Sequence, residues 1–474
     1  MGAGFDAMTD AKLWDGRFSR PTEKLMEEFN ASIRFDIRLW EADIEGNLAQ
    51  AEALRRCGVL SSEEWASIVV GLHEVGNEIA EDRYKPGPEM EDIHMAVERR
   101  LTDIVGPAGG KIHTGRSRND QVSLDVRLYL RRAVQSLERD IRAVQRVLIE
   151  RAEQEIDTFV PGYTHLQQAQ PVRLAHYLLA LFWMLERDLG RLRHARARGD
   201  RMPLGAGALA GTAFPIDRGF LCRRLGFSAP TENSIDAVSD RDHLVEAVSA
   251  LAILLTHLSR FAEDWVIWSS REFSFVELDD AYATGSSMMP QKKNPDSLEL
   301  IRGKAGRVYG DLLALLTIQK GLPLTYGKDL QEDKEPLFDA LDTAAVCLRV
   351  FAGVVGTMKF RRERLREALD PNLYATDLAD LLVERGMPFR QAHRVVGKLV
   401  GRAVDAGVAL TDLPWDDYAA ASELFRREDV NRVSPAWSTD RRSVQGGTAR
   451  GAVAEQIKRA RAILGGFGKN PVEE

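Results

Sequence analysis

The chain has 474 residues and a formal net charge of −7, with 44% hydrophobic, 28% charged and only 7% aromatic residues. This composition is ordinary for a soluble globular protein, favours helix over sheet, and at this length indicates about three domains. The negative charge argues against bulk attraction to nucleic acid. No run of about 20 apolar residues stands out as a membrane span, and no secretory signal is recognised. We therefore expect neither nucleic-acid nor membrane partners.

Cysteine and histidine usage argues against disulfides and metal sites. The three cysteines are far apart, and the nine histidines are scattered without an HExxH, CxxC or GxSxG motif. Two glycine-rich stretches also fail as cofactor sites. Gly205–Gly211 has GxGxxxG spacing and is better interpreted as a turn, and Ile112 replaces the Ser or Thr that a phosphate loop needs. We expect a cytoplasmic protein with no cofactor and no metal.

The first part of the chain, residues 1–113, is predicted to be an N-terminal domain of shorter helices and loops. A much longer pattern then covers Val122–Ile156, where apolar residues recur in steps of three and four without Pro or Gly. That spacing is typical of a long bundle helix. Its apolar positions are Val126, Leu130, Val134, Leu137, Ile141, Val144, Leu148 and Ala152.

Four further segments repeat this pattern, so that residues 114–368 are predicted to form a central domain of five long helices. The stretch Leu244–Leu258 is apolar on most faces, and such a helix must be buried on most faces. Five helices of one chain cannot cover it fully, which predicts that bundles of several subunits pack together. The four segments are Val172–Leu192, Leu244–Trp265, Leu298–Gln319 and Pro336–Met358.

The remaining residues, 369–474, are predicted to form a small C-terminal helical domain. No convincing alternating strand pattern appears in the chain, although a short hairpin within Gly205–Pro215 stays possible. The sequence thus predicts an all-α fold of three helical domains, in which the central five-helix bundle packs into a multi-subunit bundle.

Three segments interrupt the helical pattern with dense polar chemistry, and the first is His113–Gln121. It leads into the longest predicted helix with two arginines, small hydroxyls and amides. Free backbone N–H groups and the helix dipole make such a position suitable for an anion. The alternative is a capped helix start with surface arginines, in which Ser117 or Asn119 is only a cap.

The second segment, Pro161–Gln167, joins two predicted bundle helices and places His165 in a turn that contains Pro and Gly. An imidazole with a pKa near 6.5 can donate or accept a proton near neutral pH. A single loop histidine is more often only solvated, so this segment alone is a weak indication.

The third segment, Thr284–Asp296, combines serines, lysines and an amide. Gly285 can act as a hinge, and Pro290 and Pro295 keep the segment out of the following helix. A mobile lid that closes over an anionic substrate fits this composition. A basic surface loop is the alternative, but the pair Met288–Met289 argues against it, since such side chains serve little purpose unless the loop packs when closed.

Together the three segments resemble the signature regions of the fumarase/aspartase superfamily, whose members release fumarate from succinyl compounds. The third, in the form GSSxMPxKxNP, is the most specific. Within the superfamily the chain is most similar to the argininosuccinate lyase and delta-crystallin family, and the resemblance runs from about Lys12 to about Ile463. The supporting segments are Leu13–Phe18, Phe29–Ile33, Glu91–His94, His113–Gln121, Glu272–Phe275, Gln291–Arg302, Lys328–Lys334 and Gly386–His393.

The resemblance implies a β-elimination by general acid–base catalysis, giving arginine and fumarate in arginine biosynthesis. Ser286 is expected to remove the proton, helped by backbone amides and by Lys292, and Lys292 and Asn294 are expected to hold the reacting carboxylate. His165 is the expected acid, oriented by Glu299. The reverse assignment of base and acid to Ser286 and His165 stays open.

The other candidate residues divide by the end of argininosuccinate that they meet. The succinyl carboxylates are expected to meet Ser117, Arg118, Asn119, Thr164 and Arg241. The arginine end is expected to meet Ser32, Tyr326, Gln331 and Lys334. By itself Arg241 could equally pair with a neighbouring Asp, Lys328–Glu335 could be a solvated charge run, and His94 could be purely structural.

The resemblance also implies a homotetramer whose active sites are shared between subunits, with the small molecule argininosuccinate as substrate. Two alternatives stay open. One is another fumarate-releasing lyase of the superfamily, such as adenylosuccinate lyase. The other is a non-catalytic structural protein like some delta-crystallins, against which the presence of both Ser286 and His165 argues.

Overall fold

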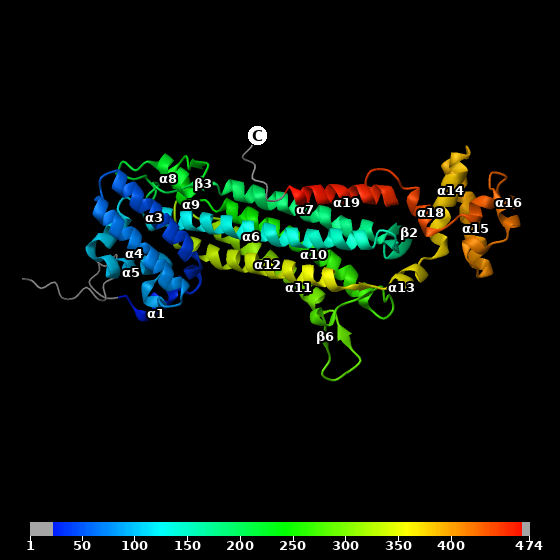
Figure 1. Ribbon diagram of the computed structural model, residues 1–474, viewed down its shortest axis with the longest axis horizontal. Coiled ribbons are helices and arrows are strands. Elements are labelled where there is room, and N and C mark those ends of the chain that lie inside the picture. The colour runs from blue at the N-terminus through cyan, green and yellow to red at the C-terminus, as the bar shows by residue number, and fades with distance from the viewer. Residues whose placement is uncertain (1–21, 467–474) are drawn as a thin grey trace, which may run out of the picture. The chain divides into compact units, whose positions relative to one another are not determined.

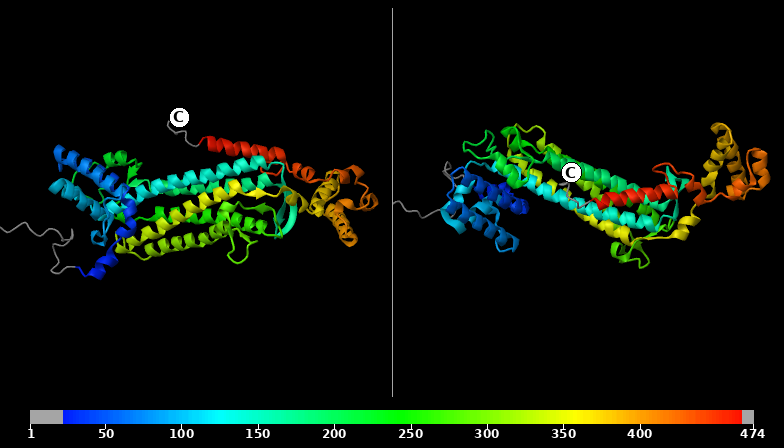
Figure 2. Two further views of the ribbon diagram at one scale, coloured as in Figure 1. Left: turned by 60° about the horizontal axis from the view of Figure 1, so that its bottom comes forward. Right: turned by 45° about the horizontal axis from the view of Figure 1, so that its top comes forward.

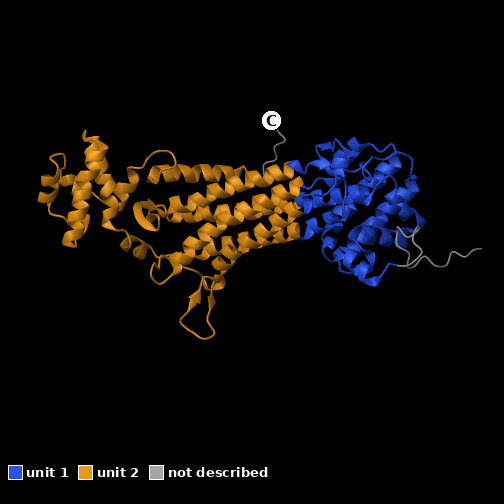
Figure 3. Ribbon diagram, turned by 180° about the vertical axis from the view of Figure 1, so that it is seen from behind, with its two compact units in different colours: residues 1–131, 198–241, 318–335 blue, residues 132–197, 242–317, 336–474 orange. Residues whose placement is uncertain are grey.

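The computed structural model describes residues 22–466, so the resembling segment Leu13–Phe18 lies outside the described residues. The described part is dominated by helices, and the predicted all-α class is confirmed. The chain divides into two compact units, each built from stretches that are not consecutive (Figure 3). Unit 1 comprises residues 1–131, 198–241 and 318–335, and unit 2 comprises residues 132–197, 242–317 and 336–474. The predicted division into three consecutive domains stays a prediction.

Unit 1 is a cluster of mostly short helices around a core made mainly of leucine, alanine and phenylalanine side chains. Local signals explain where its helices begin: Ser61 and Glu64 form a reciprocal capping box, and Asp92 caps the helix that follows it. Its core includes Ala49, Leu128 and Phe220. Its elements are α1 (Lys24–Asn30), α2 (Ile33–Asp36), α3 (Trp40–Arg56), α4 (Ser62–Ala80), α5 (Ile93–Val105), the start of α6 (Arg118–Gln154), β3 (Arg201–Met202), α8 (Arg218–Leu225), β4 (Ala229–Pro230) and α9 (Ser234–Ser239).

Unit 2 is built on a bundle of long helices. The views in Figures 1 and 2 agree that these helices run side by side. The apolar stripe predicted from Val126 to Ala152 is buried at every position, and so are the predicted stripes of the next two helices. The long helices are α6, α7 (Leu174–Arg198), α10 (Asp242–Ser269), α11 (Asp296–Gln319) and α12 (Lys334–Thr357).

Helix α10 is long and apolar enough, by length and composition alone, to cross a membrane. The sequence analysis did not identify this segment as long and apolar enough to span a membrane. However, 56% of its apolar window is buried inside the protein, and Trp265 on this helix stacks on Phe351 of α12 with ring centroids 5.1 Å apart. A helix enclosed in this way is apolar because it is a core helix, and the same composition therefore gives only weak evidence for a membrane.

The expectation that the chain has no strand pattern is wrong at one place. Strands β1 (Phe159–Thr164) and β2 (Gln167–Arg173) form an antiparallel hairpin with a register shift after Gly162. Proline and glycine interrupt the alternation, which hid these strands from the sequence pattern. Conversely, Gly205–Pro215 contains turns and no hairpin, and Gly205, Gly207 and Gly211 all have positive φ, as the turn interpretation requires.

The rest of unit 2 consists of small elements and a separate C-terminal core around Leu382, Leu399 and Tyr418. A short hairpin of β6 and β7 stands out from the bundle (Figure 1). Helix α19 lies along the bundle, where Arg461 binds Glu153 of α6. These elements are β5 (Val276–Glu277), β6 (Thr284–Gly285), β7 (Lys293–Asn294), β8 (Lys359–Phe360), α13 (Arg362–Glu367), α14 (Ala375–Glu384), α15 (Phe389–Ala406), α16 (Trp415–Ala421), α17 (Arg427–Asn431), α18 (Pro435–Asp440) and α19 (Arg450–Gly465).

Candidate active site

The N-terminus of α6 is both a capped helix start and a cationic site. Ser117 precedes the helix, and its Oγ accepts the Asn119 N–H at 3.3 Å. Asp120 accepts the Ser117 N–H and also two N–H groups of the 205–211 turn, which fixes this turn against the helix start. Burial together with the charges of Arg116 and Arg118 lowers the pKa of His113 to about 4, so the imidazole is neutral at pH 7.

Two acidic residues, Glu91 and Asp92, connect several of the candidate residues of unit 1. The Glu91 carbonyl accepts the Ser32 N–H at 2.7 Å, and the Glu91 carboxylate binds Lys328 at 3.1 Å. Asp92 lies 3.3 Å from the Arg118 guanidinium. Glu91 has a φ of 58° and a ψ of −62°, a backbone conformation that residues with a side chain rarely adopt. Strain of this kind concentrates at functional sites, and here it is held in place by the contacts on both sides.

A buried trio of Arg241, Asp333 and Lys334 forms the most enclosed part of the candidate site. Asp333 accepts from Arg241 Nε at 2.5 Å and from Lys334 Nζ at 2.7 Å. Both cations are almost fully buried, and Arg241 Nη2 has no hydrogen-bond partner within residues 22–466. Two cations and one carboxylate leave one positive charge in excess. A buried cation with an unused N–H is a position suited to an anionic ligand.

This trio corrects two interpretations of the sequence. Arg241 does not pair with a carboxylate of its neighbours Asp240 or Asp242, but with Asp333, which is 92 residues away. The run Lys328–Glu335 is not simply solvated, since Asp333 and Lys334 are buried within it. Residues Lys328–Asp333 form a single 3₁₀ segment that turns these side chains inward.

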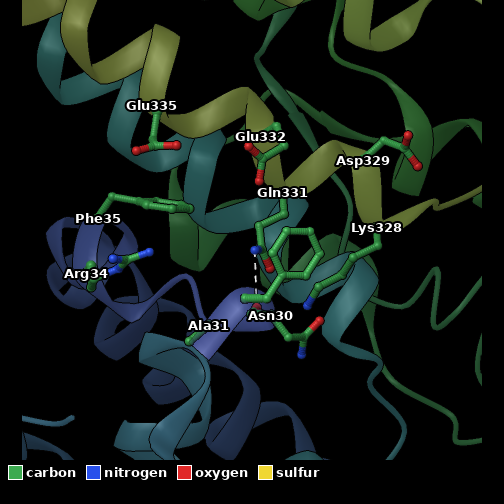
Figure 4. Close-up of a pocket in the computed structure, with 10 residues that line it drawn as sticks. Asn30, Ala31, Arg34, Phe35, Lys328, Asp329, Gln331, Glu332 and Glu335 are labelled. Carbon is green, nitrogen blue, oxygen red and sulfur yellow. Dashed lines mark hydrogen bonds between the residues drawn. The ribbon is translucent and has the colours of Figure 1, made fainter. Parts of the chain in front are cut away.

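Gln331 and Tyr326 complete the set in unit 1. Gln331 Nε2 donates to the Asn30 carbonyl at 3.2 Å, and this bond lies in the wall of a cavity of about 740 Å³ (Figure 4). Burial raises the pKa of Tyr326 to about 12 against the charge of Arg241, so the phenol stays protonated and can donate. The cavity is lined by Phe29, Asn30, Ala31, Arg34, Phe35, Lys328, Asp329, Gln331, Glu332 and Glu335.

The hairpin of unit 2 carries Ser286 directly after β6. Ser286 Oγ accepts the N–H groups of Met288 and Met289, at 3.3 and 3.1 Å. Hydrogen bonds donated to a hydroxyl oxygen stabilise its deprotonated form, which is the help that a serine base needs. Lys292 is exposed on the same hairpin, and Asn294 Nδ2 donates to the Gly285 carbonyl at 3.4 Å. Met288 is 86% exposed, so the hairpin does not pack its apolar tip within the chain.

His165 lies at the tip of the other hairpin. His165 and Leu166 have φ values of 55° and 56°, which is the conformation of a tight hairpin turn that normally favours Asn and Gly. His165 and Thr164 are exposed, and the tip borders a largely apolar cavity of about 720 Å³ that includes Tyr163, Trp268 and Phe273. Two successive left-handed residues without glycine are costly, and they turn the imidazole outward.

Glu299 lies in the first turn of α11 and is exposed there, where the helix dipole favours a carboxylate. Ser286, His165 and Glu299 make no hydrogen bond or ion pair with one another in the described part of the chain. The structure therefore brings together Ser32, Arg118, Arg241, Tyr326, Gln331 and Lys334 in unit 1, and presents the three proposed catalytic groups of unit 2 separately on its surface.

Only one group among residues 22–466 has the composition of a metal site. Ligand atoms of Asp43, His94 and Asp125 lie within 4.8 Å of one another, and all three side chains are buried. His94 Nδ1 lies 2.8 Å from the Asp43 carboxylate and 3.1 Å from the Asp125 carboxylate. The His94 ring N–H forms a hydrogen bond with Asp43, whereas neither Asp125 oxygen has a hydrogen-bond partner among residues 22–466.

Sequence reasoning passed over several residues of this region. Asn47 and Gln121 accept hydrogen bonds from Arg116 and Arg118, and Asp43 accepts from both amides. Asp43 and Asn47 are ordinary polar residues in a helical pattern, whereas Gln121 ends the predicted segment His113–Gln121 and was given no role of its own. The only available signal was polar residues at buried helical positions, because Asp43 and Asn47 lie four apart on one face, as do Gln121 and Asp125.

The chain is similar in sequence to known lyases. A family model described as "Lyase" matches residues 16–310, and one described as "Argininosuccinate lyase C-terminal" matches residues 372–438. The argininosuccinate lyase of Geobacillus sp. (strain WCH70) is 51% identical over 454 residues, which cover 96% of this chain and 99% of the relative. The argininosuccinate lyases of Symbiobacterium thermophilum and Bacillus subtilis are 52% and 50% identical, with 98% of each relative covered.

Solved structures extend the comparison. An EDDS lyase in complex with formate is 31% identical, with a TM-score of 0.82 over 94% of this chain and 90% of that chain. A class II fumarase from Schistosoma mansoni, 18% identical with a TM-score of 0.73 over 87% of this chain and 93% of that chain, shares the fold. With half of its residues identical to those of curated relatives over nearly the whole length, the chain belongs to the argininosuccinate lyase family of the fumarase/aspartase superfamily.

Proposed function

We propose that the chain splits argininosuccinate into arginine and fumarate, as the name of its relatives states for them, and so acts in arginine biosynthesis. The observation that carries the chemistry is the buried Arg241–Asp333–Lys334 trio, which has an excess positive charge and an unused guanidinium N–H. A succinyl group carries two carboxylates, and a buried guanidinium with an unused N–H is a position suited to one of them. A relative 30% identical has been solved with bound fumarate, which supports the proposed product.

In this reaction Ser286 removes the proton from the carbon next to the reacting carboxylate. Its Oγ already accepts two backbone N–H groups, and these stabilise the alkoxide that acts as the base. Lys292 and Asn294 of the same hairpin hold the reacting carboxylate, so that base and charge stabilisation arrive together when the hairpin closes.

His165 gives a proton to the guanidinium nitrogen as the C–N bond breaks, and Glu299 orients the imidazole. The proton taken from carbon and the proton given to nitrogen balance, so no redox cofactor takes part. The exchange of roles between Ser286 and His165 uses the same two groups and stays an alternative. In either assignment Thr164, next to His165, meets a succinyl carboxylate.

The groups of unit 1 hold the substrate in this proposal. Arg118 and Arg241, with Ser117 and Asn119, meet the succinyl carboxylates as charge-assisted or neutral donors. Ser32, Tyr326, Gln331 and Lys334 meet the arginine end. Tyr326 serves as a donor because its phenol stays protonated.

The active sites would be shared between copies in a cytoplasmic homotetramer. Helix α11 supports this, because the exposed side chains of Leu300, Leu313 and Leu316 (60%, 65% and 48%) lie on either side of a face that carries Gly303, Gly306 and Gly310. A Cβ added at Gly303, Gly306 or Gly310 would meet nothing within 4 Å, so a second helix can approach this face closely. An apolar face of this size on a long helix is unfavourable in water and indicates association.

The first experiment is to add argininosuccinate to the purified protein and to follow fumarate by NMR. Fumarate from argininosuccinate is expected. If argininosuccinate gives no fumarate but adenylosuccinate or aspartate does, the chain would be assigned to another lyase of the superfamily. If none of the three substrates is turned over, a crystallin-like role would be favoured.

A mixing experiment tests the shared sites. The Ser286→Ala and His165→Asn variants are each expected to be inactive, whereas mixed and reassembled subunits should recover part of the activity, because some sites then contain both intact groups. If mixtures that are shown to exchange subunits stay inactive, sites shared between copies are excluded.

A further inference from the structure

Three helices of unit 1 meet at one buried polar cluster that the proposed function does not use. Asp43 lies on α3, His94 on α5 and Asp125 on α6, and each side chain is 1% exposed or less. Gly46 allows this approach, because a Cβ there would lie 3.3 Å from Asp125 Oδ1 and 2.9 Å from Leu124. Burying two carboxylates and an imidazole is expensive unless they are paired, so their retention calls for a reason.

The cluster is connected to the cationic start of α6 by two side-chain amides. On one side, Gln121 Nε2 donates to Asp43 Oδ1 at 2.6 Å, and Gln121 Oε1 accepts from Arg118 Nη1 at 2.5 Å. On the other side, Asn47 Nδ2 donates to Asp43 Oδ2 at 2.8 Å, and Asn47 Oδ1 accepts from Arg116 Nη2 at 2.7 Å. Each amide therefore joins one oxygen of Asp43 to one arginine.

The charges of the cluster determine how these amides are oriented. Burial would lower the pKa of His94, but the Asp43 charge, the hydrogen bond to Asp43 and the Asp125 carboxyl group 3.1 Å away outweigh it and raise the pKa to about 10. The resulting imidazolium lowers the pKa of Asp43 against the effect of burial, so Asp43 is ionised. An ionised carboxylate only accepts hydrogen bonds, and both amides must therefore turn their NH₂ groups inward and their oxygens toward the arginines.

We propose that Asp43, His94 and Asp125 form a positioning unit that, through Gln121 and Asn47, sets the orientation of Arg118 and Arg116 for a dicarboxylate ligand. This inference rests on the proposed function, in which Arg118 meets the succinyl end. Guanidinium groups recognise carboxylates through fixed planar geometry, so an arginine held in advance binds with less loss of freedom. A purely structural cluster would stabilise the helices without affecting how the ligand is bound.

A double-mutant cycle separates these two possibilities. Gln121→Met keeps the approximate shape of the side chain and removes both hydrogen bonds of the amide. It is expected to raise the KM for argininosuccinate roughly tenfold, the effect of a hydrogen bond to a charged group. In an Arg118→Gln background the same substitution should change KM less than twofold, because the arginine through which it acts is missing. A full tenfold effect in both backgrounds would overturn the proposal.

Asp43→Asn is a second variant that tests the same positioning role if Gln121→Met does not fold. One acceptor oxygen becomes a donor, so either Gln121 or Asn47 loses its partner while the volume is unchanged, and KM should again rise roughly tenfold. Asp429→Asn is the matched control, since Asp429 is also a fully buried carboxylate, bound by Arg385 and Arg432, but belongs to the C-terminal part of unit 2. It should lower the melting temperature and leave KM unchanged, and an equal change in KM for both variants would contradict the proposal.

Fumarate binding to each variant by calorimetry gives a readout that does not need turnover. Weaker binding in Gln121→Met, with no further loss when Arg118→Gln is added, supports the positioning role. If wild-type protein binds fumarate in this Arg118-dependent way but does not turn over argininosuccinate, the proposed function fails and the positioning role stands. Normal turnover with wild-type fumarate affinity in Gln121→Met would refute the positioning role alone.

Discussion

In unit 1 four candidate side chains, Ser32, Arg241, Gln331 and Lys334, are buried and bound by neighbouring groups, whereas in unit 2 most candidates lie exposed on hairpins and at a helix start. Arg241 and Lys334 are held by Asp333 in the interior, while His165 is exposed at its hairpin tip and Ser286 is partly exposed on the other hairpin. A binding site benefits from groups that are fixed in advance. Groups that move protons must instead approach and leave the substrate, and an exposed hairpin allows that movement.

The largest expected effect concerns Ser286, on the hairpin of unit 2, and tests whether this exposed element carries a proton-transferring group. Ser286→Ala is expected to lower kcat roughly 10³-fold, the size of effect typical of a lost general base. Steady-state kinetics measures the fall in kcat, and thermal unfolding should show a melting temperature within the error of the wild type, because the side chain supports no core. Ser287→Ala, one residue along the same hairpin, is the control and should retain most of the activity.

The corresponding change in unit 1 should act mainly on stability. Asp333→Asn leaves the charges of Arg241 and Lys334 buried without a counterion, and loss of one partner of a buried ion pair costs about 3–5 kcal/mol. Denaturant unfolding measures the free energy of unfolding. Asp329→Asn, exposed in the same 3₁₀ segment, should cost under about 0.5 kcal/mol. Equal losses in the two variants would show that the trio is not a buried unit.

The pH dependence of stability tests the buried cluster of unit 1. The pKa of His94 is raised to about 10 from an ordinary 6.5, so the folded state holds this proton more tightly than the unfolded state. The stability that this charge contributes is fully present below pH 6.5 and is lost as the pH rises through 10. The difference in the free energy of unfolding between wild type and His94→Gln should therefore shrink from pH 6 to pH 9.5.

An independent readout of the same group is its NMR signal, which should stay that of a charged imidazolium at pH 8. A neutral imidazole at pH 8, or a stability difference that does not change with pH, would show that burial outweighs the charge of Asp43.

The smallest expected effect on the free energy of unfolding concerns the turn of unit 2 that contains His165. Leu166 has a φ of 56°, a left-handed conformation that costs a residue with a Cβ roughly 1–2 kcal/mol, and Asn adopts it more readily. Leu166→Asn should therefore raise the free energy of unfolding by up to about 1 kcal/mol. Leu166→Ala removes the same exposed apolar surface but keeps the penalty, so it should not stabilise. A gain in both variants would show that the stabilisation comes from removing the exposed leucine side chain and not from the turn conformation.

Helical periodicity predicted the bundle well. Each apolar residue proposed between Val126 and Ala152 is buried, because the spacing that forms a stripe on one helix is a local property of the chain. The hairpin at Phe159–Arg173 was missed, since Pro161, Gly162 and Pro171 remove the alternation by which strands are recognised.

The sequence by itself determined the helical class, the positions of the long helices and the three polar segments, because each depends on residues that are neighbours along the chain. Only the tertiary structure decided that Arg241 pairs with Asp333, that Lys334 is buried within a charged run, and that Gln121 joins Asp43 to Arg118. These partners are three to 92 residues apart, and whether a polar side chain is paired or solvated depends on which helices pack around it. Helical periodicity can be predicted from sequence because it depends on residues that are neighbours along the chain. Ion pairing in the interior cannot, because it depends on which distant segments pack together.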